Sequence, residues 1–560
     1  MSLLRRAPAL TLLVMLGPVL AGLAGTLLPA FGIMPALGRV EPGLMPFSEL
    51  AAWPGLPRAV ALSLGTGLGS TLLALALTML ICAGWQGTRA FRWLERALSP
   101  LLSVPHAAAA FGLAFLIAPS GWIARALAQL LGWERPPDLL ILQDPWGLSL
   151  IAGLVVKELP FLLLMTLAAL PALRPGQSLA TARSLGYGRS AGWLKTVFPR
   201  LYPQIRLPVY AVLAFSMSVV DVALILGPNT PPTLAVQVLR WMNDPDLALR
   251  LRAAAGALLQ LVLTLGALGL WRLGEMAVAR IGRAWIEAGG RARHDAPLRA
   301  LSFGAGALSA LAIILGLTAL GVWSVAGFWG FPAMLPDAFT AKSWMKQGPQ
   351  LLSPAADTAL IALVATGVAL ALVLACLEAE HRFGLRPSAR ALWLLYLPLI
   401  VPQIAFLPGL QILALVGGVD GTITAVIAAH VIFVLPYVFL SLADPYRGWD
   451  RRNAIVGHAL GASPARVFWR LRLPMLLRPM LTAVAVGCAV SVGQFLPTLL
   501  LGGGRVQTLT TEAVALASGG ARRVIGVTAL AQTAAAFLPF ALALLIPALV
   551  WRNRKGLKHG

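Results

Sequence analysis

Apolar stretches long enough to cross a lipid bilayer recur along the whole of this 560-residue chain. A membrane-spanning helix needs about 20 predominantly apolar residues. Only 12% of the residues are charged, against about 25% in a soluble domain, so the chain has too little polar surface to cover itself in water. We therefore expect an all-α polytopic membrane protein with about twelve transmembrane helices. The predicted spans are 8–31, 59–84, 98–118, 148–171, 205–227, 253–275, 301–326, 357–377, 391–415, 423–443, 479–502 and 525–550.

The distribution of basic residues predicts the orientation of these spans. The net charge is +23, and most of the 44 Lys and Arg residues lie in segments that face the same side as the N-terminus. Basic residues concentrate in the cytoplasmic loops of membrane proteins, so both termini are predicted to be cytoplasmic. This pattern explains the positive charge by membrane topology and argues against nucleic acid as a partner; membrane lipid surrounds the spans. The first apolar stretch is longer than the core of a usual signal peptide and is expected to remain as a span.

One polar segment of the chain appears twice. Gly186–Pro199 reads GYGRSAGWLKTVFP, and Gly461–Pro474 reads GASPARVFWRLRLP. Each copy begins with Gly, continues with a basic amphipathic stretch and ends with Pro. A long and nearly constant period indicates a repeated structural unit. Further matches keep the same order in the two halves: Val104-Pro105-His106 with Val401-Pro402-Gln403, Leu159-Pro160-Phe161 with Leu435-Pro436-Tyr437, Ser218 and Asp221 with Ser491 and Gln494, and Pro232-Thr233-Leu234 with Gln507-Thr508-Leu509.

The repeat predicts two halves of equal topology. Each half contains six predicted spans, and an even number returns the chain to the side from which it started. The two six-helix repeats are therefore expected to be parallel, related by an axis along the membrane normal, and to enclose a pathway between them. We place the first repeat at 1–285, a polar and basic cytoplasmic linker at 286–300, and the second repeat at 301–560.

The doubled segment resembles the loop that marks the permease subunits of binding-protein-dependent ABC importers. That family pattern reads Glu-Ala-Ala, three residues, Gly, nine residues, Ile, one residue, Leu-Pro. Both copies here keep the Gly-to-Pro spacing, and both lack the initial Glu. The matching positions are Ala180-Thr181-Ala182, Gly186, Thr196 and Phe198-Pro199 in the first copy, and Ile455-Val456-Gly457, Gly461, Leu471 and Leu473-Pro474 in the second. The resemblance covers essentially the whole chain. With both permease units in one polypeptide, the chain is similar to the fused permeases of thiamine and iron(III) importers.

This resemblance implies a function and a set of partners. In the family, each loop forms a short coupling helix that sits in a cleft of a cytoplasmic ATP-binding subunit, and a periplasmic solute-binding protein delivers the substrate. The chain would thus be a permease subunit in the bacterial inner membrane, served by two copies of the ATP-binding subunit. The residues that the resemblance places in the ATPase-coupling loops are Gly186, Arg189, Trp193, Pro199, Gly461, Arg466, Phe468 and Pro474.

The chain itself is not expected to hydrolyse ATP or to act as an enzyme. It contains no GxxxxGK[ST] phosphate-binding loop. Its Gly-rich stretch 65–69 lies inside a predicted span and lacks Lys, and small residues there favour close helix packing. No cluster of metal ligands stands out. We therefore expect no cofactor or metal on this chain, with ATP bound by the partner subunits.

Polar residues inside the predicted spans are candidates for the translocation path. Charged groups at membrane depth are costly and are often functional, but each could instead hold neighbouring helices together. Asp221 and Gln494 occupy equivalent places, and Asp221 could favour a cationic substrate. His106 and Gln403 follow repeated prolines that are expected to kink or break the third span of each half. The remaining candidates are the neighbours Lys157 and Glu158.

Two other classes of protein remain as alternatives. A secondary transporter of the major facilitator kind also has twelve spans in two parallel halves, but it usually carries its cytoplasmic motif after the second span, where this chain has none. A polytopic membrane enzyme would need clustered His, Asp or Glu residues near one interface. The substrate is expected to be small and polar, and a thiamine-like or iron-type cargo is suggested only by the family resemblance.

Overall fold

The computed structural model describes residues 2–98, 100–292, 294–385 and 388–550, and in these residues every regular element is helical. The long helices of the first half are α1 (Ser2–Ala30), α3 (Leu56–Trp85), α5 (His106–Ile117), α7 (Leu148–Ala169), α10 (Phe198–Ser218) and α13 (Leu249–Glu287). Their counterparts in the second half are α14 (Ala296–Ser324), α15 (Lys342–Phe383), α17 (Gln403–Val416), α18 (Ile423–Arg447), α22 (Leu477–Val492) and α25 (Arg522–Val550).

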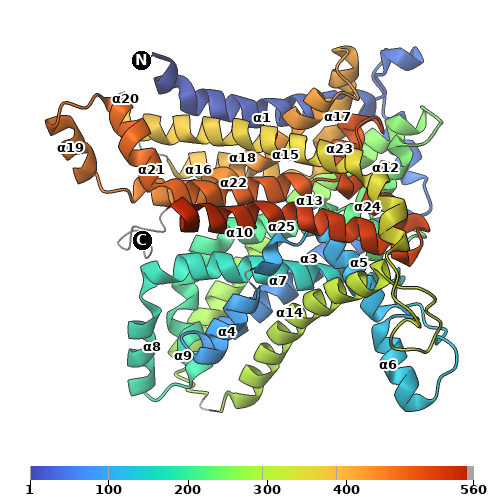
Figure 1. The fold of residues 1–560 in the computed structure, drawn as a ribbon, viewed down its shortest axis with the longest axis horizontal. Coiled ribbons are helices and arrows are strands. Elements are labelled where there is room, and N and C mark those ends of the chain that lie inside the picture. Colours follow the sequence, from blue (N-terminus) through green and yellow to red (C-terminus); the bar gives the residue numbers. More distant parts are fainter. Residues whose placement is uncertain (1, 99, 293, 386–387, 551–560) are drawn as a thin grey trace.

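Shorter helices connect or extend these long ones. They are α2 (Met45–Ala51), α4 (Arg89–Leu98), α6 (Trp122–Leu131), α8 (Pro175–Ser184), α9 (Arg189–Thr196), α11 (Asp221–Leu226), α12 (Leu234–Met242), α16 (Ala389–Ile400), α19 (Arg452–Ala459), α20 (Pro464–Val467), α21 (Leu473–Met475), α23 (Leu496–Gly502) and α24 (Leu509–Ala515). Figure 1 shows that α1 begins and α25 ends at one end of the bundle, where α8, α9, α19 and α20 also lie. We call this end the loop end.

The number of helices that can span a membrane is close to the predicted number. Within the described residues, nine helices are long and apolar enough, and the count rises to eleven if two bent helix pairs each form one span. One bent pair, α16 with α17, turns by 85° at Pro402, where a break was predicted. The remaining predicted span, 205–227, consists of α10 and α11 and is interrupted at Val219 and Val220.

The first helix of each half packs against the other half. Helix α1 lies against α15 and α17, and α14 makes the equivalent contacts with α3 and α5. Each also contacts the last long helix of its own half, α13 or α25. In Figure 1, α1 runs beside α17 at one edge of the bundle, and α14 runs beside α5 at the other. The two halves are therefore interlocked rather than separate bodies.

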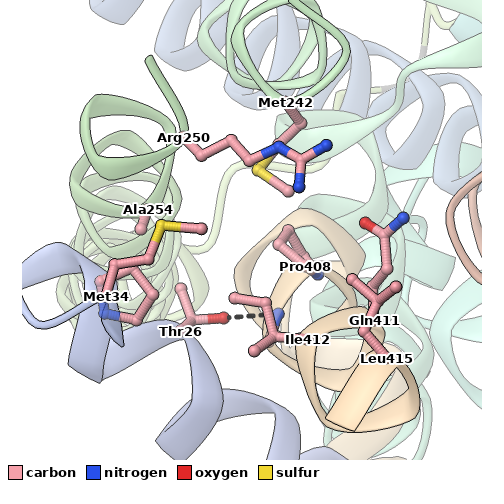
Figure 2. Close-up of a pocket in the computed structure, with 11 residues that line it drawn as sticks. Thr26, Met34, Met242, Arg250, Ala254, Pro408, Gln411, Ile412 and Leu415 are labelled. Atoms are coloured by element: carbon pink, nitrogen blue, oxygen red, sulfur yellow. Dashed lines mark hydrogen bonds between the residues drawn. The ribbon is translucent and has the colours of Figure 1, made fainter. Parts of the chain in front are cut away.

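Helices α1 and α14, which each pack against the opposite half, are called the exchanged helices. Glycine pairs allow them to approach α17 and α5 closely. A Cβ atom built on Gly25 of α1 would lie 2.6 Å from the carbonyl oxygen of Gly409 in α17. In the equivalent crossing, a Cβ on Gly316 of α14 would lie 2.8 Å from the backbone of Gly112 in α5. The Thr26 hydroxyl also accepts a hydrogen bond of 3.1 Å from the Gly409 N–H (Figure 2). The pocket in Figure 2 holds only about 10 Å³, so the first crossing is tightly packed.

Small residues tighten the interior of the first half as well. A Cβ on Gly67 would lie 2.7 Å from the side chain of Met217, so α3 and α10 meet closely at that glycine. This agrees with the packing role predicted for the Gly-rich stretch, although Gly65 has no neighbour within 4 Å. The three cysteines are free and buried.

Candidate coupling loops and translocation path

The two copies of the repeated segment fold in the same way at their start. In the first loop, α8 ends before Gly186 and α9 follows; in the second loop, α19 ends before Gly461 and α20 follows. Gly186 and Gly461 have φ angles of +82° and +79°. Side-chain-bearing residues rarely adopt this left-handed conformation, so the conformation accounts for glycine at both positions and reverses the chain direction between the helices.

The two helices of each loop pack through a small residue, placed on opposite helices in the two copies. In the first loop, a Cβ on Gly192 of α9 would contact the Cβ of Ala182 in α8 at 3.0 Å. In the second loop, a Cβ on Gly457 of α19 would meet the Val467 side chain of α20 at 3.1 Å. Both loops thus consist of two packed helices joined by a turn. The glycine at the contact lies on the second helix of the first loop and on the first helix of the second loop.

Trp193, which is expected in the coupling contact, lies inside the chain. This side chain has no exposed surface, and its indole N–H donates a hydrogen bond of 2.7 Å to Gln86. Arg189 is half-buried and donates to the Gln86 carbonyl oxygen. Burial and the charges of Arg183 and Arg299 lower the pKa of Arg189. An arginine nevertheless remains charged at neutral pH. Both predicted contact residues therefore bind inside the chain.

The second loop is anchored by a buried ion pair that the sequence did not reveal. Arg472 pairs with Glu378 of α15, and the two side chains are only 3% and 5% exposed. The Arg472 guanidinium also lies 4.5 Å from the ring of Trp449, and the Glu378 carboxylate accepts a hydrogen bond from Tyr446. Both loops are thus fixed to the same end of the equivalent helices α3 and α15, by hydrogen bonds to Gln86 in the first copy and by an ion pair with Glu378 in the second.

The two prolines of the motif take different places in the two loops. Pro199 lies in the first turn of α10, and Pro474 lies in α21, which continues directly from the π-helical turn Phe468–Arg472. The first turn of a helix tolerates proline because its N–H groups have no partner within the helix. Pro199 therefore starts α10, whereas Pro474 lies near the end of the continuous helical stretch Pro464–Met475, which is followed by a 73° bend into α22. Both prolines are exposed.

Exposed apolar side chains on the loops identify a surface that the sequence analysis missed. Leu185 and Leu460 precede the two glycines and are 58% and 83% exposed. Trp469 of the second loop is also exposed, as is Arg466, whereas Phe468 is half-buried. The signal was present in the sequence, because a Leu-Gly pair occurs at the same position of both copies. In the first loop, α8, α9 and the end of α13 enclose a cleft of about 460 Å³.

Two helix breaks define the candidate translocation path. The break between α10 and α11 ends at Asp221, and the break between α22 and α23 contains Gln494. The two residues predicted to be equivalent thus occupy equivalent breaks. Broken helices at membrane depth are characteristic of transporter binding sites, because they present backbone groups to a substrate.

Other predicted path residues gather at these breaks. His106 lies 3.6 Å from Glu158, and it also interacts electrostatically with Asp221. In the second half, the amide of Gln403 donates to the side-chain oxygen of Gln494 at 3.3 Å. His106 begins α5 directly after Pro105, which confirms the predicted break of that span. We call these five residues the central polar residues.

Lys157 does not join them. Its ammonium group donates to the carbonyl oxygens of Leu101 and Leu102, at 3.2 and 3.0 Å. These bonds satisfy the end of the short helical turn before α5, so Lys157 joins two parts of the first half. This favours the structural alternative for Lys157, whereas its neighbour Glu158 faces His106.

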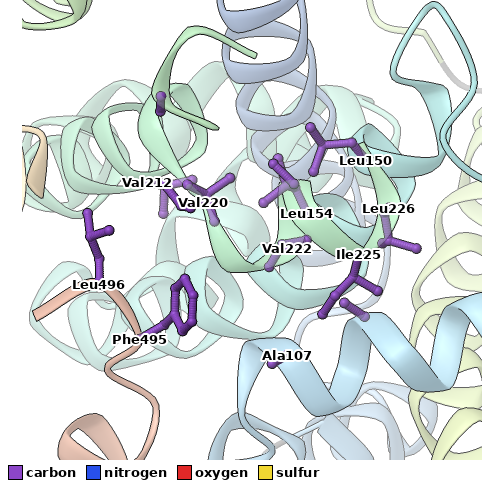
Figure 3. Close-up of a cluster of buried hydrophobic side chains, with 14 of the residues drawn as sticks. Ala107, Leu150, Leu154, Val212, Val220, Val222, Ile225, Leu226, Phe495 and Leu496 are labelled. Carbon is purple, nitrogen blue, oxygen red and sulfur yellow. The ribbon is translucent and has the colours of Figure 1, made fainter. Parts of the chain in front are cut away.

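Apolar side chains from both halves pack around the breaks. Val219 and Val220 belong to the same buried cluster as Phe495 and Leu496 of the second half. Figure 3 shows Phe495 and Leu496 on one side of this cluster and the turn that carries Val220 and Val222 beside it. Buried apolar side chains of both halves thus meet at the two breaks.

Comparisons with known proteins agree with this architecture. No family model matches the chain. The chain is 34% identical over 559 residues to the inner membrane ABC transporter permease protein YnjC of Escherichia coli, with 98% of both chains covered. It is also 31% identical over 185 residues to the molybdenum transport system permease protein ModB of Mycobacterium tuberculosis, covering 29% of this chain and 68% of ModB. The spermidine/putrescine transport system permease protein PotC of Haemophilus influenzae is 25% identical over 114 residues, covering 20% of this chain and 44% of PotC.

A helical membrane bundle with two internal repeats and paired loops at one end defines a transport protein of the permease class. The full-length likeness to YnjC makes the assignment more specific: this chain belongs to the permease subunits of ABC transporters and is a multi-pass protein of the inner membrane. Its two repeats are those of an ABC importer permease fused into one polypeptide. The family assignment replaces the major facilitator alternative.

Proposed function

We propose that this permease is driven by two ATP-binding subunits, each of which grips one of the two repeated loops. The observation that supports this most directly is the pair of exposed leucines, Leu185 and Leu460, held at matching turns at the loop end of the bundle. Exposed apolar groups at matching places favour two similar docking events. Because α8 and α19 lead into long helices through these loops, a moving partner would shift those helices as rigid bodies.

The proposal also includes topology and substrate delivery. The loop end would face the cytoplasm, as the concentration of basic residues predicts. A periplasmic solute-binding protein would then release its substrate at the opposite end of the bundle. Hydrolysis would belong to the partner subunits, since the sequence contains no phosphate-binding loop.

We infer that the transported solute is a small polar cation. Glu158 and Asp221 supply two carboxylates to the central polar residues, and the basic side chain of His106 lies 3.6 Å from Glu158. Gln403 and Gln494 add hydrogen-bonding groups without charge. This composition fits a positively charged, hydrogen-bonding solute, such as a polyamine or a thiamine-like cation, better than an anion.

The docking proposal is tested by the double variant Leu185→Asp with Leu460→Asp. Each Asp would place a charge in the apolar contact, so stimulation of ATP hydrolysis by the reconstituted permease should fall at least about tenfold, equivalent to about 1.4 kcal/mol. The matched control is Leu247→Asp, because Leu247 is also exposed but lies before α13 at the opposite end of the bundle. Full stimulation in the double variant would show that the loops are not the docking sites.

A further inference from the structure

The segment between the two repeats lies on the first loop. Lys195 of α9 donates to the carbonyl oxygens of Trp285 and Gly290, at 2.8 and 2.9 Å, and its ammonium group is 4.5 Å from the Trp285 ring. The Gly188 N–H, directly before α9, donates to the carbonyl oxygen of Arg291 at 2.9 Å. The linker therefore contacts α9 at both the start and the end of this helix.

Asp295 of the linker supplies the cap that α9 lacks. A helix leaves its first N–H groups without a partner inside the helix, and a Ser, Thr, Asp or Asn side chain before the helix usually accepts one of them. Gly188 occupies that position and has no side chain. The Asp295 carboxylate instead accepts a hydrogen bond of 2.6 Å from the Ser190 N–H. Asp295 also opposes the neighbouring positive charges at Arg189.

The second loop contains its own cap at the matching position. Ser463 stands where the first loop has Gly188, and its hydroxyl accepts a hydrogen bond from the Arg466 N–H. The backbone angles agree closely: φ and ψ are −59° and 158° at Gly188, and −66° and 158° at Ser463. In both loops a side chain accepts a hydrogen bond from a first-turn N–H group. The acceptor belongs to the second loop itself, but it comes from the linker in the first loop.

We propose that the linker is a working part of the first loop, and that Asp295 is the positioning residue that holds α9 in shape for the ATP-binding subunit. The linker then stabilises the first loop as well as connecting the two repeats. The first loop depends on Asp295 of the linker for its helix cap, whereas the second loop depends on its own Ser463. This inference rests on the proposed docking function of the loops.

The test compares Asp295→Ala with the double variant Asp295→Ala, Gly188→Ser in the full-length chain. Loss of a helix cap weakens local helical order by about fivefold. Hydrogen exchange in 189–196 should therefore accelerate about fivefold in Asp295→Ala, and the stimulation of partner ATP hydrolysis should fall with it. Gly188→Ser recreates the local cap of the second loop, so the double variant should regain slow exchange and most of the stimulation. Glu134→Ala is the control, since Glu134 is an exposed acid after α6, outside both the loops and the linker.

Each outcome decides between the possibilities. Unchanged exchange in Asp295→Ala would overturn the capping role, and faster exchange with full stimulation would overturn its part in coupling. Failure of Gly188→Ser to restore either measurement would also count against the inference. If the unmodified permease does not stimulate its ATP-binding partner at all, the proposed docking function fails instead, while the exchange result still reports on the cap.

Discussion

Trp193 and Phe468 stand at matching positions of the two loops, but their burial and their contacts differ. Trp193 is fully buried and bonded to Gln86, whereas Phe468 is half-buried beside an exposed Trp469. The motif therefore records a common backbone shape and not a common set of contacts. The spacing of Gly and Pro could be read from the sequence, but the burial of each side chain depends on α3 and α15, which are distant in the chain.

The buried pair of Arg472 and Glu378 gives a first prediction at this scale. Removing one partner of an isolated buried pair leaves an uncompensated charge, which costs about 3–5 kcal/mol. Glu378 also pairs with the partly exposed Arg382, so the loss of Arg472 should cost less than that. Arg472→Gln should therefore lower the thermal unfolding temperature of the purified permease clearly, and the double variant Arg472→Gln, Glu378→Gln should recover part of the loss. Arg447→Gln serves as control, because its pair with Glu380 is about one-third exposed on the Arg447 side and exposed pairs contribute at most about 1 kcal/mol. Equal losses in both single variants would contradict this account.

The substrate inference leads to a second residue-scale prediction. Asp221→Asn keeps the shape of the side chain but removes its charge, so uptake of a cationic solute at low concentration should fall by about tenfold, since a hydrogen bond to a charged group contributes about 1.5–3 kcal/mol. Uptake assays in vesicles would measure this, with Asp138→Asn as a control at an exposed carboxylate before α7. If Asp221→Asn transports the cation normally, the carboxylate does not select the cargo.

At the scale of helices, the sequence predicted some breaks and missed others. Pro105 and Pro402 marked the breaks before α5 and α17 because proline removes a backbone donor. The break at Val219 and Val220 carries no such marker, since two β-branched apolar residues fit an uninterrupted span. Its polar neighbour Asp221 was visible, and so was the equivalence with Gln494. Val219 and Val220 share a buried cluster with Phe495 and Leu496 of the second half, and no local pattern records such distant packing.

The crossings between exchanged helices give an element-scale prediction. Gly316→Val should force α14 away from α5, because even a Cβ at Gly316 would lie 2.8 Å from the Gly112 backbone. Overpacking of this kind costs about 1–3 kcal/mol, so the yield of folded permease and its unfolding temperature should both drop. Gly321→Val on the same helix is the matched control, since nothing lies within 4 Å of that position. Similar behaviour of the two variants would show that the close crossing does not stabilise the bundle.

At the scale of the whole molecule, composition and repetition were sufficient for the fold class but not for the arrangement. The exchange of α1 and α14 between halves could not be predicted, because helices in lipid associate through close packing rather than through a hydrophobic pattern that singles out a partner. Full-length likeness to an ABC transporter permease places the whole bundle in that family. The central polar residues and the paired loops lie in different parts of the bundle, so long helices must connect them.

The most direct test of the account is solute accumulation in sealed vesicles that contain the purified permease, measured with and without its ATP-binding subunits and binding protein. We predict concentrative uptake only when both partners and ATP are present, and none when the permease is alone. Concentrative uptake by the permease alone, with no nucleotide-hydrolysing protein in the vesicles, would contradict the claim that an external ATPase operates this bundle through its two loops.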